Sequence, residues 1–447
     1  MTYMTHLRWE RTVFWKYFEM YLLLFLMIII AITERVDQLE SEFHPYFYPF
    51  RTSFKNFLPG FFTIVKLKHY KMKKIYTTII VLASLISVKS YGQGCVAIRG
   101  NSSCNALSGN GFELQSKEWT VSLNGRYFES FRHFRGSEEE HERIEKGTQV
   151  INDSYFVDLS VGMGITDRLY ANVTLPYVHH LRSSMYEHGG NPPNGLGERH
   201  ETSSKGLGDV RFGAGYWLLP QGKKNYNYAF GLGVKLPTGK YDYTDIFYNQ
   251  GADKSQDIEG VVDQSIQPGD GGVGINLDFQ GYHSFSSRFG ILSSAFYMSN
   301  PKATNGVLTR NKRSEFSCPD QFGVRIAAYA NMGVFSSFVG GRIEGVPASD
   351  LIGSSEGYRR PGYAVSVEPG ISYGKGPVAA FVSVPIALYR NRIQSYEDKI
   401  TTAETGKFTQ GDAAFADYLV NVGVSYRFGG HQMHSSQKGS LKIQMAE

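Results

Sequence analysis

The chain has 447 residues, of which 42% are hydrophobic and 14% aromatic, and it contains 49 glycines. Its mean hydropathy of −0.27 excludes a bundle of transmembrane helices, whereas abundant Tyr, Phe and Gly at this hydropathy are typical of a transmembrane β-barrel. The net charge of +5 indicates no nucleic-acid partner, because the basic residues gather near the N-terminus and form no basic stripe.

The first 92 residues contain two possible starts. Residues 1–71 include a short apolar run, and residues 72–92 have the features of a secretory signal peptide. A basic start at Met72-Lys-Lys is followed by an apolar stretch and by Ser90-Tyr-Gly92, a small-x-small cleavage site. We expect translation to begin at Met72 and residues 1–71 to be an upstream misreading. A real membrane anchor in front of the signal is the alternative.

Residues 93–116 are expected to form a short segment in the periplasm or inside a barrel lumen. Cys95 and Cys104 lie in this segment, and in an oxidising compartment they could close a small disulfide loop. Two free thiols are the alternative. Cys318, the third cysteine, is assigned no role. Because no His or second Cys pair lies nearby at ligand spacing, no metal site and no cofactor are predicted.

From residue 117 to 428, about twelve runs alternate large apolar residues with small or polar ones. This period of two predicts strands with one apolar and one polar face. The runs are Trp119–Phe131, Tyr155–Ile165, Leu169–His180, Gly208–Leu219, Tyr226–Lys240, Gly272–Phe285, Arg288–Ser299, Phe322–Asn331, Phe335–Gly345, Tyr363–Tyr373, Val378–Tyr389 and Tyr418–Phe428. The tail 429–447 is polar and is expected to be disordered.

The connections between these runs alternate in length. Those after the second, fourth, sixth, eighth and tenth runs are short, such as Thr166–Arg168, and the others are long and polar, such as Leu181–Gly206. Short periplasmic turns and long outer loops are the signature of an outer-membrane barrel, which must close because lipid leaves no partner for a free sheet edge. The sequence therefore predicts an all-β, transmembrane antiparallel up-and-down barrel of about twelve strands. A smaller barrel with an N-terminal plug is the alternative.

This architecture implies a location and two partners. A signal peptide and a barrel together predict the outer membrane of a Gram-negative bacterium, with outer-membrane lipid around the wall. The last strand ends on the aromatic Phe428, which is how such strands usually present themselves to the barrel-assembly machinery. Small-molecule solutes are the third expected partner, and no nucleic acid is expected.

Three stretches, Gly206–Tyr216, Phe230–Gly239 and Gln267–Val273, carry a family resemblance. They resemble outer-membrane transporters assigned to the MetA pathway of phenol degradation, distant relatives of fatty-acid-type import channels. The resemblance spans most of residues 117–428. It implies a barrel and the passage of small molecules of apolar or aromatic character, and it supplies no agreed binding residues.

Charged residues of both signs occupy positions that should face the lumen. They are Arg126, Asp158, Asp209, Arg211, Lys235, Asp278, Arg325, Arg342, Glu344, Glu368 and Arg427. Charges in a low-dielectric surround must pair or face water. They either guide solutes through a polar lumen or pair with one another and stiffen the barrel.

The acidic stretches and the histidines of the sequence indicate little about function. The acidic stretches Glu138–Arg143 and Asp242–Asp270 are interpreted as solvated outer loops without a partner. Binding of divalent cations or of cationic surface partners is the alternative. An enzyme of the outer-membrane lipase kind would need a Ser beside a His such as His179 on the outer rim, and no nucleophile motif is present. We therefore predict no enzyme but a channel or transporter for small molecules, with a non-conducting barrel that acts through its outer loops as the alternative.

Overall fold

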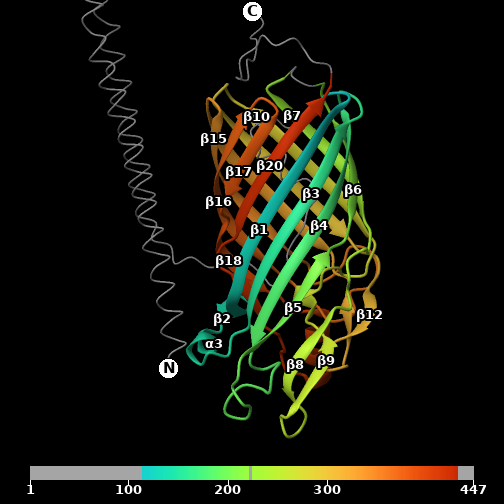
Figure 1. Cartoon of the computed structure of the whole chain (residues 1–447), viewed down its shortest axis with the longest axis vertical. Coiled ribbons are helices and arrows are strands. Elements are labelled where there is room, and N and C mark those ends of the chain that lie inside the picture. Colours follow the sequence, from blue (N-terminus) through green and yellow to red (C-terminus); the bar gives the residue numbers. More distant parts are fainter. Residues whose placement is uncertain (1–112, 221–223, 431–447) are drawn as a thin grey trace, which may run out of the picture. The chain divides into compact units, whose positions relative to one another are not determined.

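The structure is a computed structural model that describes residues 113–220 and 224–430. Within these residues, twelve strands pair antiparallel with their neighbours and close into a barrel (Figure 1). In ring order they are β1 (Glu118–Arg135), β3 (Ile151–Gly164), β4 (Leu169–Ser184), β6 (Arg211–Trp217), β7 (Tyr226–Lys235), β10 (Gly274–Ser284), β11 (Phe289–Ser299), β14 (Gln321–Met332), β15 (Phe335–Val346), β16 (Gly362–Lys375), β17 (Val378–Ser383) and β20 (Val420–Gly429). The ring closes where β1 pairs with β20, from Glu118 opposite Gly429 to Tyr127 opposite Val420. This confirms the predicted twelve-stranded antiparallel barrel.

The alternation in the sequence becomes an apolar outside and a polar inside. In β20, Val422, Val424 and Tyr426 are 44%, 48% and 52% exposed, whereas Asn421 and Ser425 between them are buried. Apolar side chains on the outside and polar ones within are what a bilayer requires of a barrel. Closure pairs the backbone groups that an open sheet edge would leave without partners in lipid.

Two of the short turns share one local chemistry. The Thr166 hydroxyl accepts hydrogen bonds from the backbone N–H groups of Arg168 (3.2 Å) and Leu169 (2.9 Å). Ser286 does the same in the turn between β10 and β11, accepting from Arg288 and Phe289 at 3.2 Å each. Ser and Thr favour such turns because the hydroxyl replaces a backbone acceptor. All five short turns lie at the upper end of the barrel in Figure 1, as predicted from the connection lengths.

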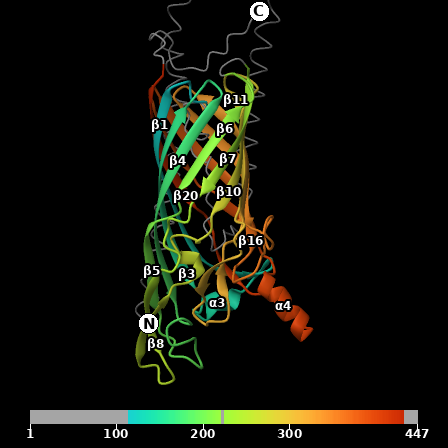
Figure 2. The ribbon, with the colours of Figure 1, turned by 90° about the vertical axis from the view of Figure 1, so that its right-hand side faces the viewer.

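The long connections at the other end are folded. They contain β2 (Glu138–Glu139), α3 (His141–Glu145), the β8 (Thr244–Gln250) and β9 (Gln256–Val261) hairpin, the 3-10 turn η2 (Gln264–Ile266), the pair β12 (Thr304–Leu308) and β13 (Glu315–Ser317), and α4 (Tyr396–Thr405). Three further strands, β5 (His200–Leu207), β18 (Ile386–Arg392) and β19 (Ala413–Ala416), lengthen the wall beyond β6, β17 and β20. Figure 2 shows α4 projecting sideways from this end.

Two strand limits differ from the prediction. The expected loop Leu181–Gly206 is partly strand, because β4 continues to Ser184 and β5 pairs with it. The expected run Val378–Tyr389 is split into β17 and β18 at Val384-Pro385. Proline has no N–H to give to the ladder, so the pairing is interrupted there.

Several predictions fall outside the described residues. These are the extension 1–71, the signal peptide 72–92, the Cys95–Cys104 disulfide and most of the segments 93–116 and 429–447. No helix in residues 113–220 and 224–430 combines the length and apolar character needed to cross a membrane.

Candidate functional site

The eleven sequence-predicted lumen residues all lie on the inner side of the wall. They alternate with outward apolar neighbours, as Arg427 does between Tyr426 and Phe428, which are 52% and 45% exposed. Lys235 is 3% exposed and Glu368 is fully buried. The structure brings ten of the eleven into two clusters, and Arg427 lies apart near the mouth with the short turns. The two clusters are described next.

The first group is the arginine cluster, which consists of Arg126, Arg325, Arg342, Glu344 and Glu368. The carboxylate of Glu368 lies 2.9 Å from Arg325 Nε and 3.8 Å from Arg342 Nη1. Arg342 also donates to Glu344, at 3.0 Å from Nε. Arg325, Arg342, Glu344 and Glu368 therefore each have an opposite charge beside them, which is the condition for placing a charge in a low-dielectric wall.

Arg126 joins the arginine cluster through two neutral side chains. Its Nε donates to Asn421 Oδ1 at 3.2 Å, and Asn421 Nδ2 donates to the Ser383 hydroxyl at 3.2 Å. Ser383 in turn donates to Glu368 at 2.7 Å. The chain of hydrogen bonds runs across β1, β20, β17 and β16 and ties the closing seam of the barrel to the cluster.

The second group is the aspartate cluster, which consists of Asp158, Asp209, Arg211, Lys235, Asp270 and Asp278. Arg211 lies 3.3 Å from Asp158, and Lys235 pairs with Asp270 and lies 3.7 Å from Asp209. Asn276 donates to Asp278. Four carboxylates face two cations, so this side of the lumen carries a formal negative charge.

Asp270 comes from a segment that sequence reasoning placed outside. Residues 262–271, called the inner loop here, turn into the barrel from the end with the long connections. Val262 and Ile266 have no exposed surface, and Ser204 on β5 donates to the carbonyl of Ile266. The prediction of a solvated, partnerless acidic loop is therefore wrong for this part. Burial of the two apolar side chains favours the inward position.

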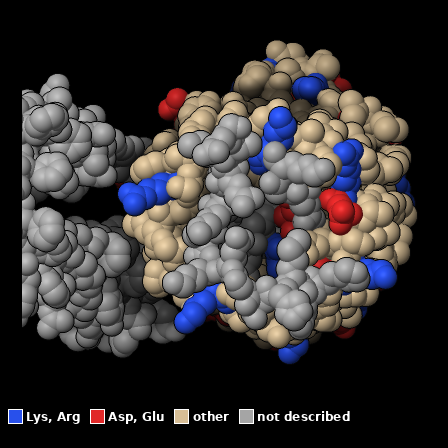
Figure 3. All heavy atoms as spheres, turned by 90° about the horizontal axis from the view of Figure 1, so that it is seen from above, with Lys and Arg blue, Asp and Glu red and all other residues tan. Residues whose placement is uncertain are grey.

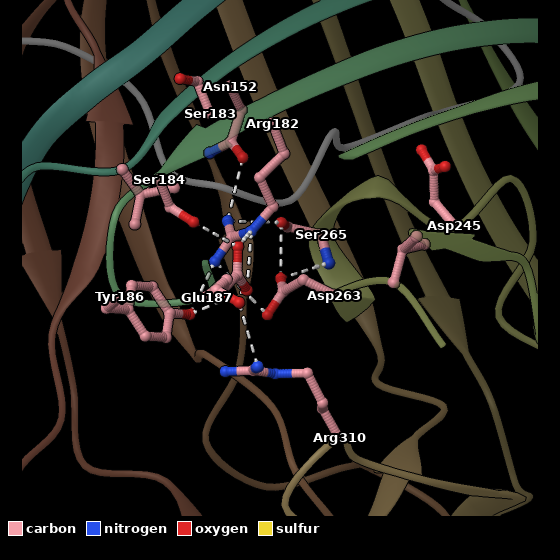
Figure 4. A network of polar contacts seen from close by, with 12 residues as sticks. Asn152, Arg182, Ser183, Ser184, Tyr186, Glu187, Asp245, Asp263, Ser265 and Arg310 are labelled. Carbon is pink, nitrogen blue, oxygen red and sulfur yellow. Dashed lines mark hydrogen bonds and ion pairs between the residues drawn. The ribbon is translucent and has the colours of Figure 1, made fainter. Parts of the chain in front are cut away.

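The inner loop is held by a buried clamp centred on Asp263 (Figure 4). Arg360 makes two hydrogen bonds to its carboxylate, at 2.7 and 2.8 Å, and Arg182 lies 3.6 Å away. Arg182 also pairs with Glu187 at 3.0 Å. Burial alone would raise the pKa of Asp263, but the two arginines hold this pKa well below its usual range.

The clamp joins opposite sides of the barrel. Arg182 belongs to β4, and Arg360 lies two residues before β16. In the ring of twelve, β4 and β16 are five places apart in one direction and seven in the other. The Asp263 carboxylate thus binds arginines from two facing sides of the wall and fixes the inner loop across the mouth.

Further contacts fix the rest of the inner loop. Gln264 donates to the carbonyl of Ser317 at 2.8 Å, and Gln267 accepts from the N–H of Tyr243 at 2.9 Å. The buried thiol of Cys318 donates to the carbonyl of Asp270 at 3.1 Å. Between the inner loop and the wall remains a cavity of about 80 Å³, large enough for a few water molecules.

The other mouth is crossed by residues 113–117, called the strap here. The Glu113 carboxylate accepts from Tyr282 at 3.2 Å and from Asn227, and its carbonyl accepts from Arg427 at 3.2 Å. Tyr282 on β10 and Arg427 on β20 stand on opposite sides of the ring. Sequence reasoning left open whether this segment lies inside the lumen or beneath it. The structure places the strap in the mouth.

Replacing Glu113 with alanine is expected to release the strap and raise the rate at which small solutes pass the barrel a few-fold, because two side-chain hydrogen bonds are lost. Solute flux into liposomes measures this. Gln115→Ala, an exposed neutral change in the same segment, is the matched control. Equal rates for both variants would show that the strap does not limit passage.

Aromatic side chains also enter the lumen, closer to the strap. Trp217 is 1% exposed, and its ring lies 6.4 Å from that of Tyr170 and 6.3 Å from that of Tyr282. Phe338 and Phe381 are buried in a neighbouring group, against which Tyr282 also packs. The interior between the mouths is therefore occupied by charged, amide and aromatic side chains.

The acidic segment Glu138–Arg143 is less solvated than the sequence predicts, because Glu139 and Glu140 form ion pairs within the chain. Arg132 pairs with Glu139, and Glu140 pairs with Arg135 and with Arg143 at 2.6 Å each. The end with the long connections is thus a folded cap, because its carboxylates have arginine partners supplied by β1 and by α3.

His188, in the connection between β4 and β5, makes this cap sensitive to pH. It is fully buried, and its Nδ1 accepts from the N–H of Tyr248 at 3.0 Å. Burial lowers the pKa of His188 from 6.5 to about 4. Between pH 6.5 and 4, His188 is protonated in the unfolded cap but stays neutral in the folded cap. The free energy of unfolding of the cap therefore falls as the pH drops through that window, by up to about 3 kcal/mol.

The variant His188→Asn keeps an acceptor for Tyr248 and does not titrate. We expect the protease resistance of the wild-type outer loops to fall between pH 6.5 and 4 and that of the variant to stay level. His141→Asn, at a side chain 70% exposed, should behave like the wild type. A variant that loses resistance over the same window would show that another group is responsible.

Six charged residues of the site escaped sequence reasoning: Glu113, Arg182, Glu187, Asp263, Asp270 and Arg360. Arg182 does continue the alternation of β4 past His180, which was a usable signal. Val262 and Ile266 inside an otherwise polar loop were a second signal, because apolar residues in a solvated loop have no partner. Within the described parts of the chain, no group of three or more His, Cys, Asp or Glu has the arrangement of a metal site.

Part of the chain matches the model of a known family. The model of the family described as "MetA-pathway of phenol degradation" matches residues 144–288, which confirms the resemblance over that part of the chain. No curated protein is similar enough in sequence to match the chain.

Three solved barrels are similar in structure at low identity. The COG4313 outer membrane channel from Pseudomonas putida F1 has a TM-score of 0.49 and 10% identity, over 71% of this chain and 98% of that one. The β domain of the Bordetella autotransporter BrkA has a TM-score of 0.39 and 11% identity, over 70% of this chain and 100% of that one. The Pseudomonas putida toluene transporter TodX has a TM-score of 0.36 and 10% identity, over 77% of this chain and 100% of that one. Their names describe different roles, and their likeness to this chain does not select one of them.

Proposed function

We propose that the chain is an outer-membrane channel that lets small molecules cross the wall it forms. The observation that carries the proposal is the lining of the barrel, where charged and amide side chains run from one mouth to the other inside an apolar exterior. A barrel that only had to be stable would gain more from an apolar filling, because buried ion pairs are seldom better than packed hydrophobic residues.

The channel is narrow, and a segment of the chain crosses each of its two mouths. The inner loop crosses the outer mouth and the strap crosses the periplasmic one, and about 80 Å³ of cavity remains beside the inner loop. Pockets for drug-sized ligands are several times larger. Passage of a solute therefore requires the inner loop to shift, and the channel conducts in small, intermittent steps.

Small aromatic compounds are the solutes we propose among those that pass. Trp217, Tyr170 and Tyr282 give the lumen flat apolar faces, and the amide groups near them, Gln280 beside Tyr170 and Asn227 opposite Tyr282, can bind a hydroxyl. The description of the matching family, which names phenol degradation, supports the same class.

Swelling of liposomes that contain the folded full chain tests the proposal. We expect solutes up to the size of a substituted benzene to enter faster than into empty liposomes, and larger sugars not to enter. Protein that has been unfolded by heat before reconstitution is the control. No entry of any solute through folded protein would contradict the channel, and a non-conducting barrel that acts through its folded outer cap would take its place.

A further inference from the structure

The end of the barrel with the short turns carries a basic rim. Arg168, Lys224 and Arg288 lie in three of the five short turns, and Lys375 ends β16 beside a fourth. Lys117 precedes β1 at the same end. These five residues are called the basic belt. Figure 3, which looks onto this end, shows Lys and Arg at several places around the perimeter, with some Asp and Glu among them.

The basic belt borders the apolar exterior directly. Arg288 lies beside Phe289 and close to Phe285, which are 53% and 63% exposed. Lys224 is two residues from Tyr226, which is 39% exposed. Arg168 donates to the hydroxyl of Tyr216 at 3.2 Å. Aromatic and basic side chains meet in this way at the level of lipid headgroups.

Few carboxylates oppose the belt. Among the described residues of this end, Asp167 is exposed in a turn, and Glu118 is tied to the N–H of Gln115 at 2.8 Å and to Arg427 at 4.0 Å. Glu113 lies inside the mouth, where its carboxylate accepts from Tyr282 at 3.2 Å. Lys224, Arg288 and Lys375 are exposed, so their charges face the surroundings of the wall. A ring of exposed cations around one end of a barrel, at the edge of the membrane, attracts anionic lipid headgroups.

We propose that the basic belt binds the phosphate groups of anionic phospholipids in the periplasmic leaflet and so fixes the depth of the barrel in the membrane. The inference rests on the proposed outer-membrane location and not on conduction. Each cation near an anionic surface strengthens binding roughly fivefold. Losing three of them should weaken lipid binding by on the order of a hundredfold at low salt.

Binding of phosphatidylglycerol to the folded full chain in detergent, counted by native mass spectrometry, tests the proposal. The variant Lys224→Gln, Arg288→Gln, Lys375→Gln removes three exposed charges and leaves the Arg168–Tyr216 bond in place. The control variant Lys312→Gln, Arg313→Gln, Lys399→Gln removes three exposed charges from the opposite end. We expect retained phosphatidylglycerol in the wild type and the control, loss in the belt variant, and weaker binding at high salt.

Three results would overturn the proposal. They are equal retention by the belt variant and the wild type, equal retention of zwitterionic phosphatidylcholine, and full displacement of the lipid by inorganic phosphate. Liposome swelling is measured separately, so a failed channel and a failed lipid site give different patterns. Heat modifiability on a gel shows that each variant is folded before it is compared.

Discussion

Replacing Asp263 with asparagine is expected to free the inner loop and to raise the rate of liposome swelling about tenfold. The substitution leaves Arg182 and Arg360 without their shared carboxylate, and removing one partner of a buried ion pair costs roughly 3 to 5 kcal/mol. The cost falls on the closed position of the loop, because the wall strands keep their backbone pairing. The loop should also become sensitive to added protease from the outer side.

The matched control lies on the same connection. Asp253→Asn makes the same chemical change at the tip of the β8–β9 hairpin, where the carboxylate is fully exposed and bonded only within its own turn to Ser255. It should leave both swelling and protease resistance at wild-type values. Equal behaviour of the two variants would show that the clamp on Asp263 does not hold the mouth closed.

Replacing Glu368 with alanine is expected to destabilise the barrel wall by roughly 3 to 5 kcal/mol, because Arg325 and Arg342 would face each other across the β14–β15 pair without a shared carboxylate. Arg325 and Arg342 are direct cross-strand partners, and like charges in that position repel. The readout is the temperature at which the folded band is lost on a gel, which should drop clearly.

Two further variants separate charge from packing. Glu356→Ala removes an exposed carboxylate from the connection before β16 and should not change the folded band. Glu368→Gln keeps the size of the side chain and its bond with Ser383, so it should fall between the wild type and the alanine variant. If the Glu368→Ala variant loses its folded band at the same temperature as the wild type, the arginine cluster does not stabilise the wall.

The wall was predictable from local pattern. In Tyr418–Phe428 the alternation of apolar and polar residues gave the last strand to within two residues of its start, and Thr166–Arg168 gave a short turn at its observed place. Both depend on neighbours within a few positions of the chain, where periodicity and turn chemistry act. The inward direction of residues such as Lys235 and Glu368 follows from the same period.

The inner loop could not be predicted in this way. Asp263 meets Arg182 and Arg360, and its bond to Arg360 spans 97 positions of the chain. Which of several arginines a loop carboxylate finds depends on how the whole barrel closes, and no local pattern carries that information. The strap poses the same problem, because Glu113 lies before the first strand and meets residues more than a hundred positions away.

The central claim is that this barrel is a narrow channel closed by its inner loop. Single-channel current through the folded full chain in a planar bilayer, recorded for the wild type and for Asp263→Asn, tests it most directly. The account predicts small, intermittent steps for the wild type and larger, longer openings for the variant. Silent membranes for both proteins, with folding shown by heat modifiability, would contradict the account.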